Sequence, residues 1–340
     1  MCEYRRCQFK LFCLFIDGNY DWFSAHFFIS CSCSKPTRWL RLLKVTSIYT
    51  LYHGIETRSY LVVSEGQGVL IDSGSAQTAR QYIAPELKKF SVGRPFALRF
   101  IVNTHSHPDH SGGNSLLKSN WGASILVHQS ESRYVSDRTR ALRTQFAPYT
   151  QRFPVSENEL TELKQELGPS IKVDRNLRDG SRIEFGNCAL EVLHTPGHSR
   201  GAISLYMPRE RLLFLGDSVQ GSGVKADFPT LPIYDDIQAY GKSLGRLREL
   251  DVSIAFASHP FLPLGKTRLR SAEYRKLIDA SIEAANRMGD TIKDAARHGL
   301  NALEITRRIM LMSGWVQVDA VPVFALKSVE AFLRNKRSSQ

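Results

Sequence analysis

Apolar and polar positions form short runs along most of the chain, and turn residues separate these runs. Ten of the runs predict strands. They lie at 47–51, 59–63, 69–71, 98–102, 124–127, 182–185, 189–193, 203–207, 211–215 and 253–257. Three- and four-residue spacing of apolar side chains predicts helices at 76–90 and 236–250 and throughout the chain from Ser271 onward. Strands in two sets with helices outside each predict an α/β protein in which two sheets pack face to face between helices.

The length of 340 residues predicts one large domain with appendages. We expect this domain at 45–265, with a capping insertion at about 130–170, because the stretch 131–167 is largely polar and helix-permissive. A C-terminal helical region is expected at 266–340. Residues 1–44 are rich in Phe and Cys and lack periodicity, which predicts a disordered N-terminal extension. A targeting segment and a misassigned start are the alternatives for these residues.

The formal net charge of +12 widens the range of partners to consider. Clustered Lys and Arg bind nucleic acid because they release counterions from phosphates, but the basic residues here are spread along the chain with acidic residues between them. This distribution favours a solvated basic surface, and an anionic substrate or RNA is the alternative. No apolar run approaches the ~20 residues of a membrane span. We therefore expect no membrane partner.

Cysteines are concentrated at the N-terminus. Five of the six lie in the first 33 residues, and Cys188 alone lies in the main domain. This excludes a disulfide framework for the fold and predicts a reduced protein in the cytoplasm, with a mitochondrial location as the alternative. A zinc site made from Cys31, Cys33 and His26 would fit no known finger spacing.

A predicted strand leads directly into a segment rich in histidine. Three imidazoles and a carboxylate stand within six residues there, at His105, His107, Asp109 and His110. Alternation places His105 and His107 on one side of an extended segment, where both reach a single ion about 2 Å away. Asp109 and His110 then turn toward a neighbouring position. The segment 111–113, Ser-Gly-Gly, supplies flexible backbone leading into a helix.

Further metal ligands must come from elsewhere in the chain, because one short cluster cannot complete a tetrahedral shell. Three suitable residues, His198, Asp217 and His259, each follow a predicted strand. Loops at strand ends are where a scaffold usually carries its chemistry. His194 is instead expected to end a strand. The remaining histidines, expected on the surface or in the core, are His26, His53, His128 and His298.

This set of residues resembles the metallo-β-lactamase fold hydrolases, whose signature is HxHxDH followed by a later His, a bridging Asp and a final His. The resemblance covers about Val45 to Pro263, with every ligand in the family's order. It implies a four-layer αβ/βα sandwich of two mixed sheets flanked by helices. It also implies a role for each site residue. By the resemblance, His105, His107 and His198 hold a first metal ion, Asp109, His110 and His259 hold a second, Asp217 bridges both, and Asp72 supports the ligands through hydrogen bonds from behind.

Two divalent ions that share a water lower its pKa, so the resemblance implies hydrolysis by a bridging hydroxide. Zinc is expected, with iron or manganese as alternatives, and Asp109 is the expected catalytic residue because it can orient the hydroxide and carry a proton. We expect the substrate to be an ester, thioester or lactone of a small anionic molecule rather than nucleic acid. The protein could also form a homodimer. The alternatives are a phosphodiesterase or ribonuclease of the same fold, an iron-dependent persulfide dioxygenase, and a non-catalytic binding module.

Several positions of this chain differ from the residues typical of particular subfamilies of these hydrolases. Asp217 argues against the true β-lactamases, which resemble this pattern but often have Cys or Ser there. Lactonases of the family often have Tyr three residues later, where this chain has Gln220, although Tyr234 or Tyr240 could replace it. Ser258 precedes the final His where the family usually has Gly. The interval between His110 and His198 is longer than in compact glyoxalase II-like members. The C-terminal helices loosely resemble the tails of that group, whose basic residues can bind acidic substrates.

Overall fold

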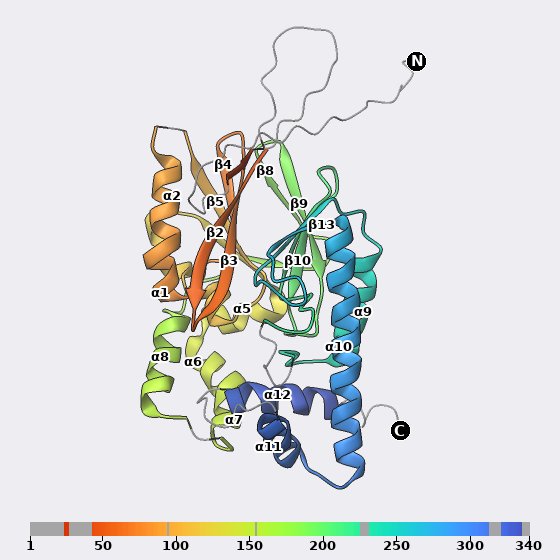
Figure 1. The fold of residues 1–340 in the computed structure, drawn as a ribbon. Helices are drawn as coiled ribbons and strands as arrows, with labels where there is room; N and C mark the ends of the chain where they lie inside the picture. Colours follow the sequence, from red (N-terminus) through yellow and green to blue (C-terminus); the bar gives the residue numbers. More distant parts are fainter. Residues whose placement is uncertain are drawn as a thin grey trace.

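The computed structural model describes residues 24–26, 43–93, 95–153, 155–224, 231–312 and 321–334. Within these ranges the strands form two sheets, one of seven strands and one of six. The sheets face each other, with helices on their outer sides (Figure 1). The expected α/β fold of two mixed sheets flanked by helices is confirmed.

The first sheet follows the order of the chain. Its strands are β1 (Ser24–His26), β2 (Leu43–Tyr52), β3 (Ile55–Ser64), β4 (Gln67–Ile71), β5 (Ala97–Asn103), β6 (Ser124–His128) and β7 (Arg175–Leu177). Strands β1 to β4 pair antiparallel, whereas β4 to β7 pair parallel. Parallel strands end at the same edge of a sheet. Ile71 of β4 therefore pairs with Val102 of β5, which brings the residues after both strands together.

The second sheet has the order β13-β12-β11-β10-β9-β8. Its strands are β8 (Arg182–Phe185), β9 (Cys188–His194), β10 (Ile203–Met207), β11 (Leu212–Gly216), β12 (Ile254–Ala257) and β13 (Arg268–Arg270). Only β11 and β12 pair parallel, with Gly216 opposite Ala257. The segments that begin with Asp217 and Ser258 consequently leave the sheet side by side.

Helices cover the outer faces and one end of the sheets. In chain order they are α1 (Ala76–Thr78), the π-helical turn η1 (Ala79–Ile83), α2 (Ala84–Ser91), α3 (Pro108–Ser111), α4 (Asn114–Trp121), α5 (Gln129–Ser136), α6 (Arg138–Ala141), the π-helical turn η2 (Leu142–Phe146), α7 (Ala147–Thr150), α8 (Glu157–Leu167), α9 (Ile237–Arg248), α10 (Ser271–Arg297), α11 (Ala302–Met312) and α12 (Val321–Arg334). Helix α2 stands beside the first sheet and α9 and α10 beside the second, while α7, α11 and α12 lie below the sheets in Figure 1.

Three apolar clusters hold these layers together. One fills the space between the sheets, and the other two lie between each sheet and its helices. In the central cluster the rings of Phe214 and Phe256 stack with centroids 4.9 Å apart. The hydroxyl of Tyr60 on β3 donates to the backbone O of Ala257 at 2.6 Å. This bond ties the first sheet to the end of β12, just before His259.

All ten predicted strands form, most within one or two residues of the predicted bounds, although β2 and β3 reach further into their shared hairpin. The predicted helices at 76–90 and 236–250 and those beyond Ser271 also form, and the stretch 131–167 is largely helical. Strands β7 and β13 were not predicted. Each has three residues and a single buried side chain, Leu177 or Leu269, so neither shows a hydrophobic pattern.

The expected boundary at 265 falls just before the end of the second sheet, because β13 pairs with β12. The division into 45–265 and 266–340 stays a prediction. The expected extension 1–44 lies outside the described residues except for β1 and the start of β2. In the described part of the chain, no helix combines the length and apolar character needed to cross a membrane.

Candidate metal centre

The histidine-rich loop begins where β5 ends, and its backbone is held from behind. Nδ2 of Asn103 donates to the backbone O of His110 at 2.8 Å, and Nδ2 of Asn114 donates to Oδ1 of Asn103 at 2.7 Å. Pro108 opens α3, a position where the missing N–H would have no helical partner anyway. These contacts close 104–110 into a compact loop whose imidazoles and carboxylate start from nearby points.

Three imidazole nitrogens meet at one point. Nε2 of His105 lies 2.9 Å from Nδ1 of His107 and 3.1 Å from Nε2 of His198, and the last two atoms are 2.9 Å apart. These three residues are the first of the expected ligand groups. A tetrahedral zinc ion with bonds of about 2.0–2.1 Å separates its nitrogens by roughly 3.3 Å, close to this spacing.

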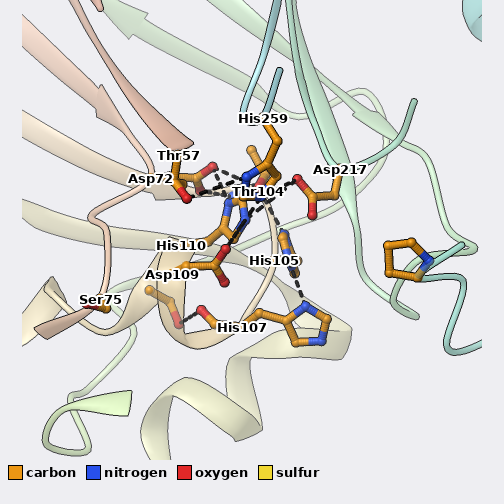
Figure 2. A network of polar contacts seen from close by, with 12 residues as sticks. Thr57, Asp72, Ser75, Thr104, His105, His107, Asp109, His110, Asp217 and His259 are labelled. Carbon is orange, nitrogen blue, oxygen red and sulfur yellow. Dashed lines mark hydrogen bonds and ion pairs between the residues drawn. The ribbon is translucent and has the colours of Figure 1, made fainter. Parts of the chain in front are cut away.

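Asp109, His110 and His259 form the second group (Figure 2). Oδ2 of Asp109 lies 3.3 Å from Nε2 of His110 and 3.5 Å from Nε2 of His259. Asp217 stands between the two groups. Its Oδ1 is 3.6 Å from Nε2 of His110 and 3.5 Å from Nε2 of His259, whereas its Oδ2 is 3.6 Å from Nε2 of His198. One carboxylate thus faces both groups.

Two of the donor atoms have no hydrogen-bond partner in the described part of the protein, and a metal ion would supply one. Nε2 of His110 and Oδ1 of Asp217 are buried without a hydrogen-bond partner among the described residues. A buried polar atom left unpaired in this way is costly, so each needs a partner that the protein side chains do not supply. Imidazole nitrogens and carboxylate oxygens are the ligands of zinc and of related divalent metals. The arrangement can therefore hold two ions that share Asp217.

Hydrogen bonds from the outer nitrogen hold three rings with Nε2 facing the centre, where a neutral ring offers the lone pair of that atom to a metal ion. The outer nitrogen is Nδ1 in each case. The pairs are His110 with Oδ2 of Asp72 at 2.8 Å, His198 with the backbone O of Pro232 at 2.5 Å, and His259 with the backbone O of Glu56 at 2.9 Å. Asp72 thus contacts the outer nitrogen of His110, and its supporting role stays a prediction.

Burial and charge shift the pKa values of the two groups differently. Burial, reinforced by the neighbouring imidazoles, holds the pKa values of His105 and His107 well below 6.5. In the second group burial lowers the pKa of His259, but the carboxylates of Asp217 and Asp109 together outweigh burial and raise that pKa to about 10. Burial likewise opposes ionisation of Asp217, yet His259 and His110 keep the pKa of that carboxyl far below its usual range. The carboxylate is ionised and the first imidazoles are neutral, the forms that bind metal.

Gln220 occupies the position where lactonases of the family often have Tyr. Its side chain is fully buried, and Nε2 donates to the backbone O of Asp217 at 3.1 Å and to that of Pro232 at 3.0 Å. Since Pro232 also accepts from His198, Gln220 braces two of the seven donors through the backbone rather than facing a substrate.

Tyr234 and Tyr240, the two candidates to replace that tyrosine, lie in different surroundings. The ring of Tyr234 has its centroid 5.6 Å from that of His107 and 5.2 Å from that of His198. The hydroxyl of Tyr240 instead accepts from the backbone N of Gln220 at 3.2 Å, inside the core of the second sheet. Only Tyr234 of these two is placed beside the donors.

A cavity of about 530 Å³ opens beside the first group, with His107 and His198 in its wall. Helix α12 contributes Lys327, whose side chain is 5% exposed and whose ammonium lies 4.5 Å from the ring centroid of Tyr234. The rings of Phe146 and Tyr149 lie 5.2 and 5.7 Å from the same ammonium. Burial lowers the pKa of Lys327 to about 8. Further cations in the wall are Arg200 and Arg334.

The remaining described histidines lie outside the donor groups. His194 ends β9 as expected, and its ring stacks on that of His128 with centroids 4.3 Å apart. His53 packs edge-on against Tyr52, and His298 is exposed at the end of α10. The side chain of His26, Cys31 and Cys33 lie outside the described residues.

Three residues at the site are not among the predicted site residues, namely Glu131, Arg138 and Lys327. Glu131 and Arg138 lie in the expected capping insertion, and both side chains are buried. Lys327 was covered only by the general expectation of a basic tail. A single Glu, Arg or Lys carries no spacing signal, so only the packing of α5, α6 and α12 against the site could reveal them.

Comparisons with known proteins agree with this geometry. The sequence profile of the Metallo-beta-lactamase superfamily matches residues 55–259, more than half of the chain. Hydroxyacylglutathione hydrolase from Brucella anthropi is 26% identical over 182 residues, which cover 53% of this chain and 56% of that protein. The chain therefore spans only a little over half the length of this curated relative.

Solved structures share the fold. A metallo-beta-lactamase family protein from Thermus thermophilus superposes with a TM-score of 0.65 at 20% identity, covering 87% of this chain and 93% of its own. A beta-lactamase domain protein from Burkholderia ambifaria gives a TM-score of 0.61 at 17% identity, with 87% of each chain covered. With the profile match, these likenesses show that the chain belongs to the metallo-beta-lactamase superfamily, in which its buried His and Asp clusters are typical of the binuclear metallohydrolases.

Proposed function

We propose that this chain is a binuclear zinc hydrolase that cleaves a thioester, or a related ester or lactone, of a small anionic molecule. His105, His107 and His198 would hold one ion, Asp109, His110 and His259 the other, and Asp217 both. Two zinc ions held there supply Lewis acidity and lower the pKa of a shared water toward neutrality. The single observation that carries the proposal is the convergence of these donors into two groups that share Asp217, with His107 and His198 also in the wall of a cavity that contains Lys327.

Asp109 is the proposed catalytic residue. Its side chain is 14% exposed, compared with 0% for His110 and 8% for Asp217 and His259. Burial opposes the charge of Asp109, but His110 and His259 keep its pKa well below the usual range, so the carboxylate is ionised. An ionised carboxylate that reaches solvent at a metal site can orient a water and pass on its proton.

The cavity supports an anionic substrate. Lys327 is almost buried and, among the described residues, has no ion pair, so its charge is available to a ligand rather than to a neighbouring carboxylate. Arg200 and Arg334 add positive charge to a wall that also holds Glu131, Asp235 and Asp236, and Arg200 lies 3.4 Å from Oδ1 of Asp235. A carboxylate or phosphate placed there would gain charge-assisted hydrogen bonds in a poorly solvated site. The likeness to hydroxyacylglutathione hydrolase supports a thioester as the bond that is cleaved.

A phosphodiesterase acting on RNA is the second candidate, and the net charge of +12 is the observation that favours it. A thioester hydrolase and a phosphodiesterase would use the same metal-binding residues on different substrates. A nuclease would cleave bis(p-nitrophenyl) phosphate and bind RNA with an affinity that falls steeply with salt.

The test combines metal analysis with a substrate panel. Zinc, iron and manganese would be quantified in the purified protein, and hydrolysis of acyl thioesters, lactones and bis(p-nitrophenyl) phosphate would be compared in wild type, Asp109→Ala and the exposed control Asp290→Ala. We expect about two zinc ions per chain, thioester turnover in wild type and control, and near-complete loss in Asp109→Ala. Equal turnover by wild type and Asp109→Ala would refute the mechanism. One iron with oxygen consumption would point instead to a persulfide dioxygenase.

A further inference from the structure

Two buried charges of opposite sign lie behind the histidine-rich loop, and neither belongs to the donor groups. Glu131 on α5 is 1% exposed and Arg138 on α6 is 5% exposed. Both belong to the helices inserted between β6 and β7. A buried charge is retained in a fold only where strong hydrogen bonds compensate its desolvation. The partners of these two side chains therefore indicate what they do.

The carboxylate of Glu131 joins the two chain segments that supply the first donor group. Oε2 accepts from the backbone N of Ser106 at 3.2 Å and from the hydroxyl of Ser106 in a very short contact. Oε1 accepts from the backbone N of Gly201 at 2.9 Å. Ser106 lies between His105 and His107, and Gly201 follows His198 by three residues. One side chain is thus bonded to the residue between His105 and His107 and to a residue in the segment that follows His198.

The guanidinium of Arg138 bonds to the same loop. Its Nη2 donates to the backbone O of Ser111 at 2.8 Å and to Oγ of Ser111 at 3.0 Å, while its Nη1 donates to the backbone O of Ser106 at 3.4 Å. The hydroxyl of Ser111 in turn donates to the backbone O of Ser106 at 2.9 Å. Glu131 therefore holds the N–H and hydroxyl of Ser106, and Arg138 holds its carbonyl. Both peptide groups of Ser106, the residue between the two imidazoles, are thus hydrogen-bonded.

The space around these contacts leaves little freedom. A Cβ added to Gly201 would lie 2.6 Å from Cγ of Glu131 and 2.8 Å from Nδ1 of His128, closer than side-chain carbons approach in proteins. The Glu131 carboxylate is held against the backbone by this close packing. Hydrogen bonds of an ionised group in a poorly solvated interior are stronger than those between neutral groups. Such bonds can keep three imidazoles together although their mutual contacts alone would not.

We propose that Glu131 and Arg138 are positioning residues that hold His105, His107 and His198 convergent, so that the inserted helices preorganise the first metal position. Metal ligands bind best when the groups behind them fix their orientation, and loss of such a group lowers metal affinity 10–100-fold. The inserted helices then serve the metal position itself, besides lining the cavity through Glu131 and Tyr134. The inference goes beyond the proposed reaction, because it concerns metal affinity and needs no substrate.

Metal affinity of the metal-depleted full chain tests this role. Zinc affinity would be measured by competition with a chromophoric chelator, and the ligand field by the absorption spectrum of the cobalt-loaded protein. The variants are Glu131→Gln and Arg138→Lys, with exposed matched controls Glu162→Gln on α8 and Arg140→Lys on α6. We expect one of the two zinc equivalents to bind at least about tenfold more weakly in Glu131→Gln and in Arg138→Lys, with an altered cobalt spectrum. The controls should match wild type.

A purely structural role predicts a different result, namely a lower melting temperature of the metal-depleted protein with wild-type zinc affinity and an unchanged cobalt spectrum. That result would overturn the proposal. If Glu131→Gln does not fold, Ser106→Ala replaces it, because this change removes the short hydroxyl contact and keeps the backbone bond. A smaller loss of affinity for the same zinc equivalent is then expected, and wild-type affinity would again refute the role. Zinc affinity and the cobalt spectrum can be measured even if no thioester is hydrolysed. The role of Glu131 and Arg138 can therefore be refuted independently of the proposed function.

Discussion

Oδ2 of Asp72 accepts a hydrogen bond from Nδ1 of His110 across 2.8 Å, and Oδ1 of the same carboxylate accepts from the backbone N of Thr104 at 2.7 Å. This double contact follows from the parallel pairing of β4 and β5, whose ends lie at one edge of the first sheet. Asp72 has a positive φ of 60°, a conformation that Asp and Asn tolerate better than most residues. The carboxylate fixes both the start of the loop and the orientation of one imidazole.

Replacement of Asp72 by Asn should weaken metal binding without disrupting the backbone. An amide placed against Nδ1 of His110 is a poorer acceptor than a carboxylate, and it favours the wrong tautomer if its NH₂ faces the ring. We expect the affinity for one zinc equivalent to fall 10–100-fold, measured by chelator competition. The exposed control Asp290→Asn should keep wild-type affinity. Unchanged zinc affinity in Asp72→Asn would show that the contact with His110 is dispensable.

Removal of metal should destabilise the protein. Metal-free donors leave Nε2 of His110 and Oδ1 of Asp217 buried and unpaired, and a bound ion would satisfy both. We expect dialysis against a chelator to lower the melting temperature and zinc to restore it. At a free zinc concentration about 1,000 times its Kd, linkage gives about 4 kcal/mol of stabilisation per ion. Magnesium prefers octahedral oxygen ligands and should not substitute. A melting temperature that is insensitive to zinc would contradict the metal assignment.

The motif and its partners could be predicted because each donor stands in a local pattern. Alternation in the segment 105–110 and the position of His198, Asp217 and His259 after apolar strands need no knowledge of the tertiary structure. The family's order of ligands then implies a role for each donor. Strands that end at a common edge bring such residues together, as β4 with β5 and β11 with β12 do.

The residues behind and beside the donors could not be predicted, because their partners are distant in sequence. Glu131 meets Gly201 across 70 positions, and Lys327 meets Tyr234 only because α12 crosses below the sheets (Figure 1). Neither contact leaves a periodic trace in the chain. The edge strands β7 and β13 were missed for a related reason, since most of their side chains face solvent and show no apolar run.

The charge state of Lys327 should control the binding of an anionic substrate, if the proposed function holds. Burial lowers its pKa to about 8, so the ammonium is charged below that pH and neutral above it. We expect the KM of an anionic thioester to rise as pH rises through about 8. Loss of a charged hydrogen-bond partner costs about 1.5–3 kcal/mol, so Lys327→Met should raise KM at pH 7 by at least about tenfold, with kcat little changed.

Two further variants make the origin of this pH dependence visible. Lys327→Arg retains its charge throughout and should keep KM low above pH 8, because an arginine does not lose its proton in this range. Lys276→Met, an exposed change on α10, should leave the whole profile unchanged. A KM profile of Lys327→Met that still rises near pH 8 would assign the titration to another group.

Gly112 and Gly113 follow the histidine-rich loop, and the sequence suggests that they supply flexible backbone. Their φ values of −67° and −76° are instead ordinary helical angles that any residue can adopt. Crowding explains them better. A Cβ on Gly113 would lie 2.2 Å from the backbone O of Ser73 and 2.4 Å from Cβ of Ala79, and one on Gly112 would lie 2.0 Å from the backbone O of Glu166. The loop packs directly on the backbone that follows β4.

Gly113→Ala should therefore destabilise the fold even though alanine favours helices. Forcing a methyl group against a backbone carbonyl costs about 1–3 kcal/mol and would push the loop away from Ser73, whose backbone N donates to the O of His110 at 2.8 Å. Gly241→Ala on α9 is the matched control, because nothing lies within 4 Å of its added Cβ, and it should gain up to about 1 kcal/mol. Urea unfolding of the metal-depleted proteins measures both free energies. If crowding does not require glycine at position 113, Gly113→Ala should stabilise the protein as Gly241→Ala does, and its zinc affinity should match wild type. That outcome would contradict the explanation by crowding.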